Sequence, residues 1–238
     1  MSILRPVLNL FWPHRCYLCQ LTVPDTEPLS FCSSCISLLV HEPTPTCPRC
    51  ATRVGPHAIN PDGCPRCVKE TYRFASATRL GEYDGVLRDA VLRCKQAGQE
   101  GLAEHLGRLF ARVRLKDKTT LAPQAVIPVP LHWSRRLVRQ YNQAEAMARG
   151  VASELDVPII TGAVVRYRHT PRLANQSKSE RLTLMKTAFR PRKTPRLQGL
   201  RVLLVDDVLT TGATASAVSQ AILAAGAAQV DLAILAHR

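Results

Sequence analysis

The sequence predicts an α/β protein with a mainly parallel sheet flanked by helices, preceded by a small Cys-rich module. Two observations lead to this prediction. Eight of the nine cysteines form four CxxC pairs before residue 70, and beyond it apolar strand-like runs alternate with helical periods. The 238 residues suffice for one ordinary domain and a small extra module. We therefore expect a Cys-rich module over residues 1–70 and an α/β domain over residues 71–238.

Positive charge is concentrated in the larger part of the chain. The net charge is +14, and residues 71–238 hold 26 basic and 13 acidic side chains, against six and five in residues 1–70. A positive field of this kind attracts polyanions, either nucleic acid or a small phosphorylated substrate. Charge alone does not choose between these two.

The N-terminal stretch MSILRPVLNLFWPHRC is apolar, but it is too short and too interrupted to span a bilayer, and no small-residue cleavage site follows it. We expect a short helix that packs on the next module, with a membrane-surface role as the alternative. No later run is typical of a membrane span. The sequence thus predicts a cytoplasmic protein.

The cysteine spacing is typical of structural metal sites. The pairs are Cys16/Cys19, Cys32/Cys35, Cys47/Cys50 and Cys64/Cys67. The gaps between successive pairs are 12, 11 and 13 residues, and a second CxxC at this spacing completes a tetrahedral four-cysteine shell. Two structural zinc ions are therefore expected. Sequential pairing gives a double zinc ribbon, and a cross-braced pairing is also open.

Two other uses of these cysteines are weaker alternatives. A disulfide framework lacks a secretion signal to support it, and an iron–sulfur cluster also takes four cysteines. The ninth cysteine, Cys94, lies in a helical apolar pattern, so we expect a packed thiol in the core.

Periodicity and turn residues predict the elements of the larger domain. We expect a strand or hairpin over 74–83, helices from Asp84 to about Lys116 broken near Gly98 and Gly101, a strand over 125–130, a helix over 142–155, strands over 157–167 and 201–207, a helix over 214–225 closed by Gly226, and a strand over 229–236. Ligands of parallel sheets bind at the carboxyl ends of the strands, which assigns the loops after Pro130 and Val205 to the active face.

The stretch VLLVDDVLTTGAT, residues 202–214, carries the strongest functional signal. Four apolar residues predict a buried strand, so Asp206 and Asp207 are expected at the carboxyl edge of the sheet. Adjacent carboxylates suit a diol that donates hydrogen bonds or a nearby metal-bound diphosphate. Hydroxyls and backbone N–H groups at the following helix start suit a phosphate, and Gly212 permits close backbone approach. The plainer alternative is a set of helix caps and turn formers.

This stretch resembles the PRPP-binding signature of type I phosphoribosyltransferases. The resemblance implies the type I fold, with Asp206 and Asp207 on the ribose hydroxyls of phosphoribosyl pyrophosphate (PRPP) and the run Thr210, Thr211, Gly212, Ala213 and Thr214 on its 5-phosphate. Together with the CxxC pairs, four stretches make the whole chain resemble the ComF family of competence-associated and GntX-like proteins. These stretches are YDGVLRDAVLRCKQAG (83–98), IPVPLHWSRRLVRQYNQAE (127–145), TPRLANQSKSERLTLMKTAF (170–189) and the PRPP signature. In the family motif SxxERxxN, Leu184 replaces the usual Asn.

The resemblance also gives roles to basic residues. Residues 166–196 hold ten basic side chains against one acid, Glu180, and correspond to the mobile loop of the fold. Arg172, Lys178 and Arg181 are candidates to support the leaving pyrophosphate. Lys95 and the stretch Ser134, Arg135 and Arg136 are candidates to reach it from the other side. His132 and His169 have no partner in the sequence, so we expect exposed loop residues there.

Two functions are consistent with the sequence. The first is a Mg²⁺-dependent phosphoribosyltransferase that binds PRPP and transfers its ribosyl group to an unassigned acceptor. The second is a nucleic-acid-handling module for single-stranded DNA or a DNA-uptake partner, with a regulatory or vestigial PRPP site. The aromatic content of 5% disfavours extensive base stacking. The acceptor and the oligomeric state stay open.

Overall fold

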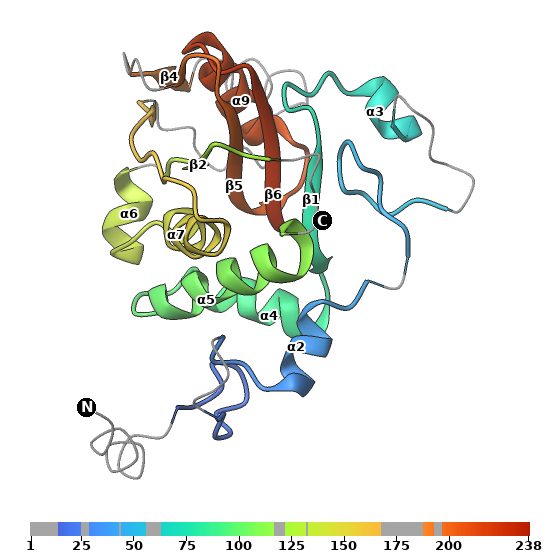
Figure 1. Cartoon of the computed structure of the whole chain (residues 1–238), viewed down its shortest axis with the longest axis vertical. Coiled ribbons are helices and arrows are strands. Elements are labelled where there is room, and N and C mark those ends of the chain that lie inside the picture. The colour runs from blue at the N-terminus through green and yellow to red at the C-terminus, as the bar shows by residue number, and fades with distance from the viewer. Residues whose placement is uncertain are drawn as a thin grey trace.

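The computed structural model describes residues 14–24, 29–42, 44–55, 63–116, 122–131, 133–167, 188–192 and 197–238, without the side chains of Trp133 and Arg135. The described residues of the Cys-rich part include the short helices α2 (Ser33–Leu39) and α3 (Pro65–Lys69). Figure 1 shows α2 beside the helices of the larger domain. No helix in the described ranges combines the length and the apolarity that crossing a bilayer requires.

The larger domain alternates strands and helices. Its strands are β1 (Ala77–Glu82), β2 (Ala125–Pro128), β3 (Val164–Arg166), β4 (Phe189–Pro191), β5 (Arg201–Leu209) and β6 (Gln229–His237). Its helices are α4 (Gly85–Arg93), α5 (Glu100–Phe110), the π-helical turn η1 (Ala111–Leu115), α6 (Trp133–Arg139), α7 (Gln143–Leu155) and α9 (Ala213–Ala224). The predicted break between the first two helices is confirmed between Arg93 and Glu100.

The central sheet has the strand order β1-β6-β5-β2, and every pairing in it is parallel. Alternate residues of β5 face opposite layers. Leu203 and Val205 join the core formed with α4, α5 and α7, whereas Val202 and Leu204 join the core formed with α9. The sheet is therefore covered on both faces, which confirms the predicted α/β class.

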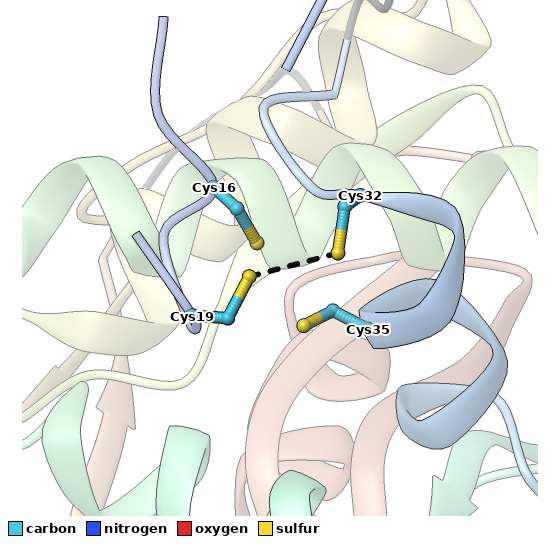
Figure 2. A group of neighbouring side chains, drawn as sticks. All are labelled: Cys16, Cys19, Cys32 and Cys35. Carbon is cyan, nitrogen blue, oxygen red and sulfur yellow. Dashed lines mark hydrogen bonds between the residues drawn. The ribbon is translucent and has the colours of Figure 1, made fainter. Parts of the chain in front are cut away.

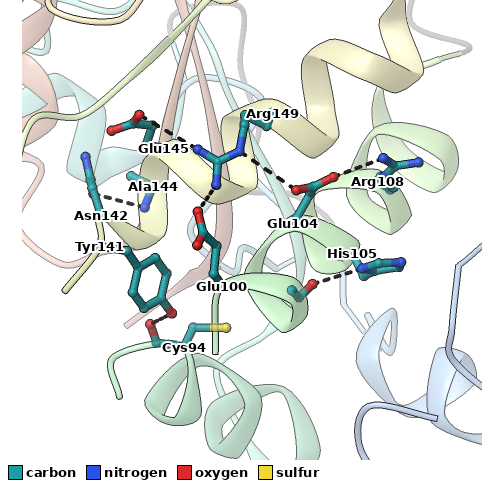
Figure 3. Close-up of polar contacts among 11 residues, drawn as sticks. Cys94, Glu100, Glu104, His105, Arg108, Tyr141, Asn142, Ala144, Glu145 and Arg149 are labelled. Atoms are coloured by element: carbon teal, nitrogen blue, oxygen red, sulfur yellow. Dashed lines mark hydrogen bonds and ion pairs between the residues drawn. The ribbon is translucent and has the colours of Figure 1, made fainter. Parts of the chain in front are cut away.

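Helices α5 and α7 cross at direct backbone contact. A Cβ atom on Gly107 would lie 2.1 Å from the Met147 carbonyl oxygen, and one on Gly150 would lie 2.0 Å from that of Glu104. Figure 3 shows the polar contacts beside this crossing, where Arg149 ion-pairs with Glu100 and lies 3.8 Å from a carboxylate oxygen of Glu104. These contacts fix α7, and with it the residues at its N-terminus.

The Cys-rich part covers the outer edge of β1. The Pro48 carbonyl accepts a hydrogen bond from the Ala77 N–H at 3.0 Å, and the His41 carbonyl accepts one from the Glu82 N–H at 3.3 Å. Arg114 donates to the Leu80 and Val40 carbonyls at 3.0 and 2.7 Å. These hydrogen bonds pack the two parts of the chain together along this edge. They also cover it, and an uncovered sheet edge is prone to pairing with other chains.

Several strand predictions differ from the structure, and β1 and β2 are shorter than the expected 74–83 and 125–130. The expected strand over 157–167 is divided: Ile159 forms a single parallel bridge with Val126, and only 164–166 continue as β3, which pairs antiparallel with β4. Gly162 has φ +74°, a left-handed conformation that turns the chain between these parts. Strand β5 also continues to Leu209, beyond the expected end at residue 207, because its pairing with β6 continues.

Candidate functional site

The candidate residues Asp206 and Asp207 lie where the parallel strands end. Asp206 and Asp207 lie within the last residues of β5, and Asp206 is still in register with Ile234 of β6. The turn Thr210–Thr214, called the phosphate turn below, follows at once and leads into α9. The same edge receives the end of β2, the corner between α4 and α5, and the N-terminus of α7.

Asp207 is buried and faces the α7 layer. Its Oδ2 lies 3.2 Å from the Lys95 ammonium and accepts a hydrogen bond from Gln143 Nε2 at 3.2 Å, while its Oδ1 accepts one from the Val208 N–H at 2.7 Å. Lys95 comes from the corner after α4. A carboxylate with this many donors is held in one position, so Asp207 presents a fixed oxygen geometry.

Asp206 is half-buried and, as the neighbour of Asp207 in an extended strand, faces the opposite layer. Its Oδ1 accepts a hydrogen bond from the Asp207 N–H at 2.8 Å. Burial, and next the adjacent negative charge of Asp207, raise the pKa of the Asp206 carboxyl well above its usual range. The two neighbouring carboxylates thus differ. Asp207 has a cationic partner, whereas the charged form of Asp206 is disfavoured by burial and by the charge of Asp207.

The phosphate turn is set by Gly212 at the N-cap of α9. Gly212 has φ +77°, a conformation that side-chain-bearing residues rarely adopt, and the Ser216 N–H donates to its carbonyl at 2.8 Å. Thr210 and Thr211 are exposed and Thr214 is half-buried, with no acid in the first turn of α9. A helix N-terminus of this kind, with hydroxyls beside it, can accept an anion.

The N-terminus of α7 is tied to the loop after β2. Asn142 accepts a hydrogen bond from the Ala144 N–H at 3.2 Å through its Oδ1 and donates to the Val129 carbonyl at 3.1 Å through its Nδ2 (Figure 3 shows the first contact). Tyr141 donates its hydroxyl proton to the Cys94 carbonyl, and Cys94 itself is buried, as predicted. The adjacent residues Tyr141 and Asn142 therefore join the α4–α5 corner to the loop after β2.

A second group of basic residues lies beside β2, apart from Asp206 and Asp207. A cavity of about 410 Å³ is lined by Pro130 and Glu145 together with three guanidinium side chains, those of Arg136, Arg166 and Arg192. The pair of strands β3 and β4 borders it. Of the predicted basic residues, Lys95 thus joins the aspartates, whereas Arg136 joins this cavity.

Several predicted residues lie outside the described part of the chain. These are Arg172, Lys178, Arg181, His132, His169, the apolar N-terminal segment and the side chain of Arg135. The segment with the three basic candidates connects β3 to β4.

The eight paired cysteines form two groups of four, Cys16/Cys19/Cys32/Cys35 and Cys47/Cys50/Cys64/Cys67, each with its sulfur atoms within 4.8 Å of one another. Sequential pairing is therefore the arrangement present. Figure 2 shows the first group, with Cys16 and Cys19 on a loop and Cys32 and Cys35 at the start of α2. All nine cysteines are free thiols.

The geometry of the cysteines fits one metal ion per group. The Sγ atoms of Cys47 and Cys67, of Cys50 and Cys64, and of Cys19 and Cys32 are 3.7 Å apart. A disulfide requires about 2.0 Å, whereas a tetrahedral zinc with bonds of about 2.3 Å separates its sulfurs by about 3.8 Å. Each four-cysteine group could hold a zinc ion.

Comparison with known proteins agrees with this geometry. The family profile "Phosphoribosyl transferase domain" matches residues 142–238, which include β5, the phosphate turn and α9. The chain is 30% identical to the "DNA utilization protein YhgH" of Salmonella typhi over 224 residues, covering 92% of this chain and 95% of that protein. It is 29% identical to the "Competence protein F" of Haemophilus influenzae over 226 residues, with coverage of 93% and 96%.

A solved purine phosphoribosyltransferase from Pyrococcus horikoshii is similar with a TM-score of 0.35 and 19% identity, over 60% of this chain and 75% of that one. The fold, the aspartate pair and the two four-cysteine groups together define a protein with a type I phosphoribosyltransferase-like domain and an N-terminal pair of metal-binding units that fit a double zinc ribbon. The chain belongs to the ComF family.

The sequence did not reveal three residues that lie at the carboxyl edge of the sheet, beside Asp207 and the phosphate turn. Gln143 was visible in the motif RQYNQAE, but nothing in the motif indicated its hydrogen bond to Asp207. Arg66 donates to the Thr210 carbonyl at 2.6 Å, and the ring of Tyr72 lies against Gly212. Both come from the end of the Cys-rich part and its connection to β1, which carried no local signal for a role at the phosphate turn.

Proposed function

We propose that this protein binds PRPP with Mg²⁺ at the end of β5 and acts as a phosphoribosyltransferase. One observation carries the proposal: two adjacent carboxylates lie near the end of a buried strand, and the turn after this strand leads into a helix with glycine at its N-cap, within a phosphoribosyl transferase domain. A diol site next to an anion site is the combination that a ribose 5-phosphate requires.

In this proposal, the ribose hydroxyls donate hydrogen bonds to Asp206 and Asp207. The ionised carboxylate is the better acceptor, so hydroxyl donors favour the charged form of Asp206, whose pKa burial and Asp207 raise in the free protein. Lys95 pairs with Asp207 and holds it in place from the opposite side. The sugar is thereby held by one prearranged acceptor and one that becomes a better acceptor as it binds.

The 5-phosphate binds at the phosphate turn. The N–H groups of the first turn of α9 point toward the helix N-terminus, and Thr210 and Thr211 add exposed hydroxyls. Backbone donors of this kind need no rearrangement to meet an anion, which favours binding.

Transfer then breaks the bond between ribose C1 and the pyrophosphate oxygen, whose electron pair leaves with pyrophosphate, while a lone pair of the acceptor forms the new bond to C1 and the acceptor's proton is released to solvent. Arg172, Lys178 and Arg181 are our candidates to stabilise that leaving charge. Carboxylate oxygens such as those of Asp206 and Asp207 are the ligand type that Mg²⁺ takes, and Mg²⁺ supplies charge neutralisation of the diphosphate.

The two four-cysteine groups are proposed to hold structural zinc, because cysteine sulfurs would fill all four positions of each shell and leave none for a substrate. Free thiols and metal-binding cysteines suit a reducing, cytoplasmic location, which we propose for this protein.

The test of enzymatic activity is a screen for pyrophosphate release. Zinc-loaded protein is incubated with Mg²⁺ and PRPP against a panel of nucleobases and amines, and the double variant Asp206→Asn/Asp207→Asn serves as control. We expect pyrophosphate with at least one acceptor and none with the control. Binding of PRPP without release for any acceptor would contradict transferase activity and leave a PRPP-binding role.

A second candidate function is the binding of single-stranded DNA, favoured by one observation and by the name of a relative, "DNA utilization protein". The guanidinium of Arg190 lies 4.1 Å from the centre of the exposed Tyr167 ring, next to the cavity lined by Arg166 and Arg192. Aromatic and cationic side chains at one surface suit the bases and phosphates of a single strand.

The test of DNA binding is a salt titration with a short oligonucleotide. The logarithm of the association constant is expected to fall with a slope of about −0.7 per neutralised phosphate. Arg190→Ala/Arg192→Ala is expected to lower the slope and the affinity, and Asp206→Asn/Asp207→Asn to change neither. Salt-independent binding, or loss of binding in the aspartate variant alone, would contradict a separate DNA surface.

A further inference from the structure

The second four-cysteine unit, Cys47/Cys50/Cys64/Cys67, contacts the phosphate turn through a residue inside one of its own CxxC pairs. Arg66 stands between the two ligands Cys64 and Cys67. Its Nη2 donates to the Thr210 carbonyl at 2.6 Å, and its Nη1 lies 3.3 Å from Nε2 of His237 at the end of β6. One guanidinium therefore joins the metal-binding knuckle to the ends of two strands.

The residues after the knuckle add two more contacts. A Cβ atom on Gly212 would lie 2.4 Å from Cε1 of Tyr72, so the ring occupies the space beside this glycine. The ring of Tyr72 is stacked on Phe74 with centroids 4.8 Å apart, and the Arg73 N–H donates to Ser216 Oγ in the first turn of α9 at 3.1 Å. The phosphate turn is thus contacted at its first residue, its glycine and the start of the helix.

The bond to Thr210 has a direct consequence for anion binding. The peptide group is planar and trans, so its carbonyl and the N–H of the next residue point in opposite directions. When Arg66 holds the Thr210 carbonyl, it also fixes the direction of the Thr211 N–H. The Tyr72 ring fills the space beside Gly212 and so blocks movement of the Gly212 backbone toward the ring. Both contacts restrict the backbone donors of the turn to one arrangement.

Arg66 is itself positioned by the cysteine ligands. Helix α3 has only five residues, too few for an isolated helix to be stable, and the Cys67 N–H donates to the Cys64 carbonyl at 2.8 Å within the knuckle. The four sulfurs are buried and lie within 4.8 Å of one another, with three of their pairs 3.7 to 3.9 Å apart. A metal ion bound by all four would therefore hold the knuckle in this form.

The first four-cysteine unit contacts another region. Arg93, the last residue of α4, donates to the Tyr17 carbonyl at 2.9 Å, and the Tyr17 ring lies 4.9 Å from that of His105 on α5. Within the described ranges, the contacts between the cysteine units and the phosphate turn come from the second unit. The two units therefore provide a matched comparison inside one molecule.

We propose that the second four-cysteine unit is a metal-dependent clamp on the phosphate turn, with Arg66 and Tyr72 as positioning residues. Metal at Cys47, Cys50, Cys64 and Cys67 holds the turn in the conformation that accepts a phosphate ester, whereas metal at the first unit does not. The inference rests on the proposed function for the identity of the ligand, but the clamp itself is a property of the ligand-free protein.

The experiment compares Arg66→Ala and Arg66→Lys with Arg53→Ala. Arg53 belongs to the same unit, but its largely exposed side chain pairs with Glu82. Three quantities are measured: zinc per chain, backbone amide exchange over residues 208–217 without ligand, and the affinity for PRPP with Mg²⁺. Arg66→Ala is expected to retain two zinc ions, to exchange faster in this segment and to bind PRPP about tenfold more weakly. Arg66→Lys is expected to recover part of both effects, and Arg53→Ala to match the wild type.

A second pair of variants tests the metal itself. Cys50→Ser is expected to speed exchange over residues 208–217, and Cys19→Ser to leave it unchanged. The proposal is overturned if Arg66→Ala retains two zinc ions and shows the amide exchange and the PRPP affinity of the wild type. If Arg66→Ala loses metal, Tyr72→Leu is measured in its place, and amide exchange over residues 208–217 equal to that of the wild type would also overturn the proposal. A wild-type protein that does not bind PRPP would refute the proposed function, while the exchange measurements still decide on the clamp.

Discussion

The Lys95 ammonium lies 3.2 Å from Oδ2 of Asp207, although one residue follows α4 and the other lies near the end of β5. Asp207 is buried, and Gln143 donates to the same oxygen. Asp206 faces the other layer, away from this pair of donors. The adjacent carboxylates therefore have different electrostatic situations, and substituting each of them is expected to have opposite effects on stability.

The substitution Asp206→Asn is expected to stabilise the free protein while abolishing PRPP binding. The folded pKa of Asp206 is raised, so the native state binds the proton more tightly than the unfolded chain, and stability falls as pH rises from the ordinary carboxyl pKa through the raised one. Removing the charge should add about 1 kcal/mol at neutral pH. Urea unfolding at pH 5 and pH 8 checks this, and a variant with the wild-type pH slope would contradict it.

The pair Lys95 and Asp207 is expected to be energetically coupled. Lys95→Met and Asp207→Asn should each destabilise the fold, because each leaves a poorly solvated polar partner, with a coupling energy of about 1 kcal/mol. A double-mutant cycle by urea unfolding measures it. Lys69→Met, at an exposed lysine, is the control, and additive effects of the first two substitutions would show that the ion pair contributes nothing.

Substitution of Gly212 is expected to cost more than its backbone conformation alone explains. Gly98 has φ +78° with nothing within 4 Å of an added Cβ, whereas Gly212 has φ +77° and Tyr72 at 2.4 Å. Gly98→Ala should cost about 1–2 kcal/mol, and Gly212→Ala clearly more. Adding Tyr72→Ala should recover only the steric part. Equal unfolding free energies for the two single glycine variants would rule out the contact with Tyr72.

The two zinc ions that we propose are expected to leave the protein at different rates. Cys19 is exposed and Cys32 partly exposed, whereas all four cysteines of the second unit are buried. Chelation followed with a colorimetric metal indicator should release two zinc ions per chain in two phases, the faster from the first unit. Cys19→Ser should remove only the fast phase. A single phase, or one zinc per chain in the wild type, would contradict this assignment.

Local patterns predicted most of the fold. The apolar run before Asp206 identified the central strand, and the helical period over 142–155 identified α7. Gly98 lies in the break between α4 and α5, whereas Gly101, also expected there, lies inside α5. The cysteine spacing led to two four-cysteine groups but could not choose the pairing, because both pairings satisfy the same spacing. The structure resolves it through the sulfur positions.

The features that the sequence did not predict depend on a local backbone conformation or on contacts between residues distant in the chain. The division of the 157–167 strand follows from the positive φ of Gly162, and the extra length of β5 follows from its register with β6. Arg66 was recognisable only as a residue inside a CxxC pair, since its hydrogen bond to Thr210 exists only after the Cys-rich part packs against the sheet. The assignment of PRPP contacts to individual side chains stays a prediction.

The most direct test of the central claim is a calorimetric titration of PRPP with Mg²⁺ into zinc-loaded wild-type protein and into Asp206→Asn/Asp207→Asn. We predict binding of one PRPP per chain to the wild type, with a dissociation constant below about 1 mM, and no detectable binding to the double variant of equal zinc content. Absence of binding to the wild type, or equal binding to both proteins, would contradict the assignment of the PRPP site to the end of β5.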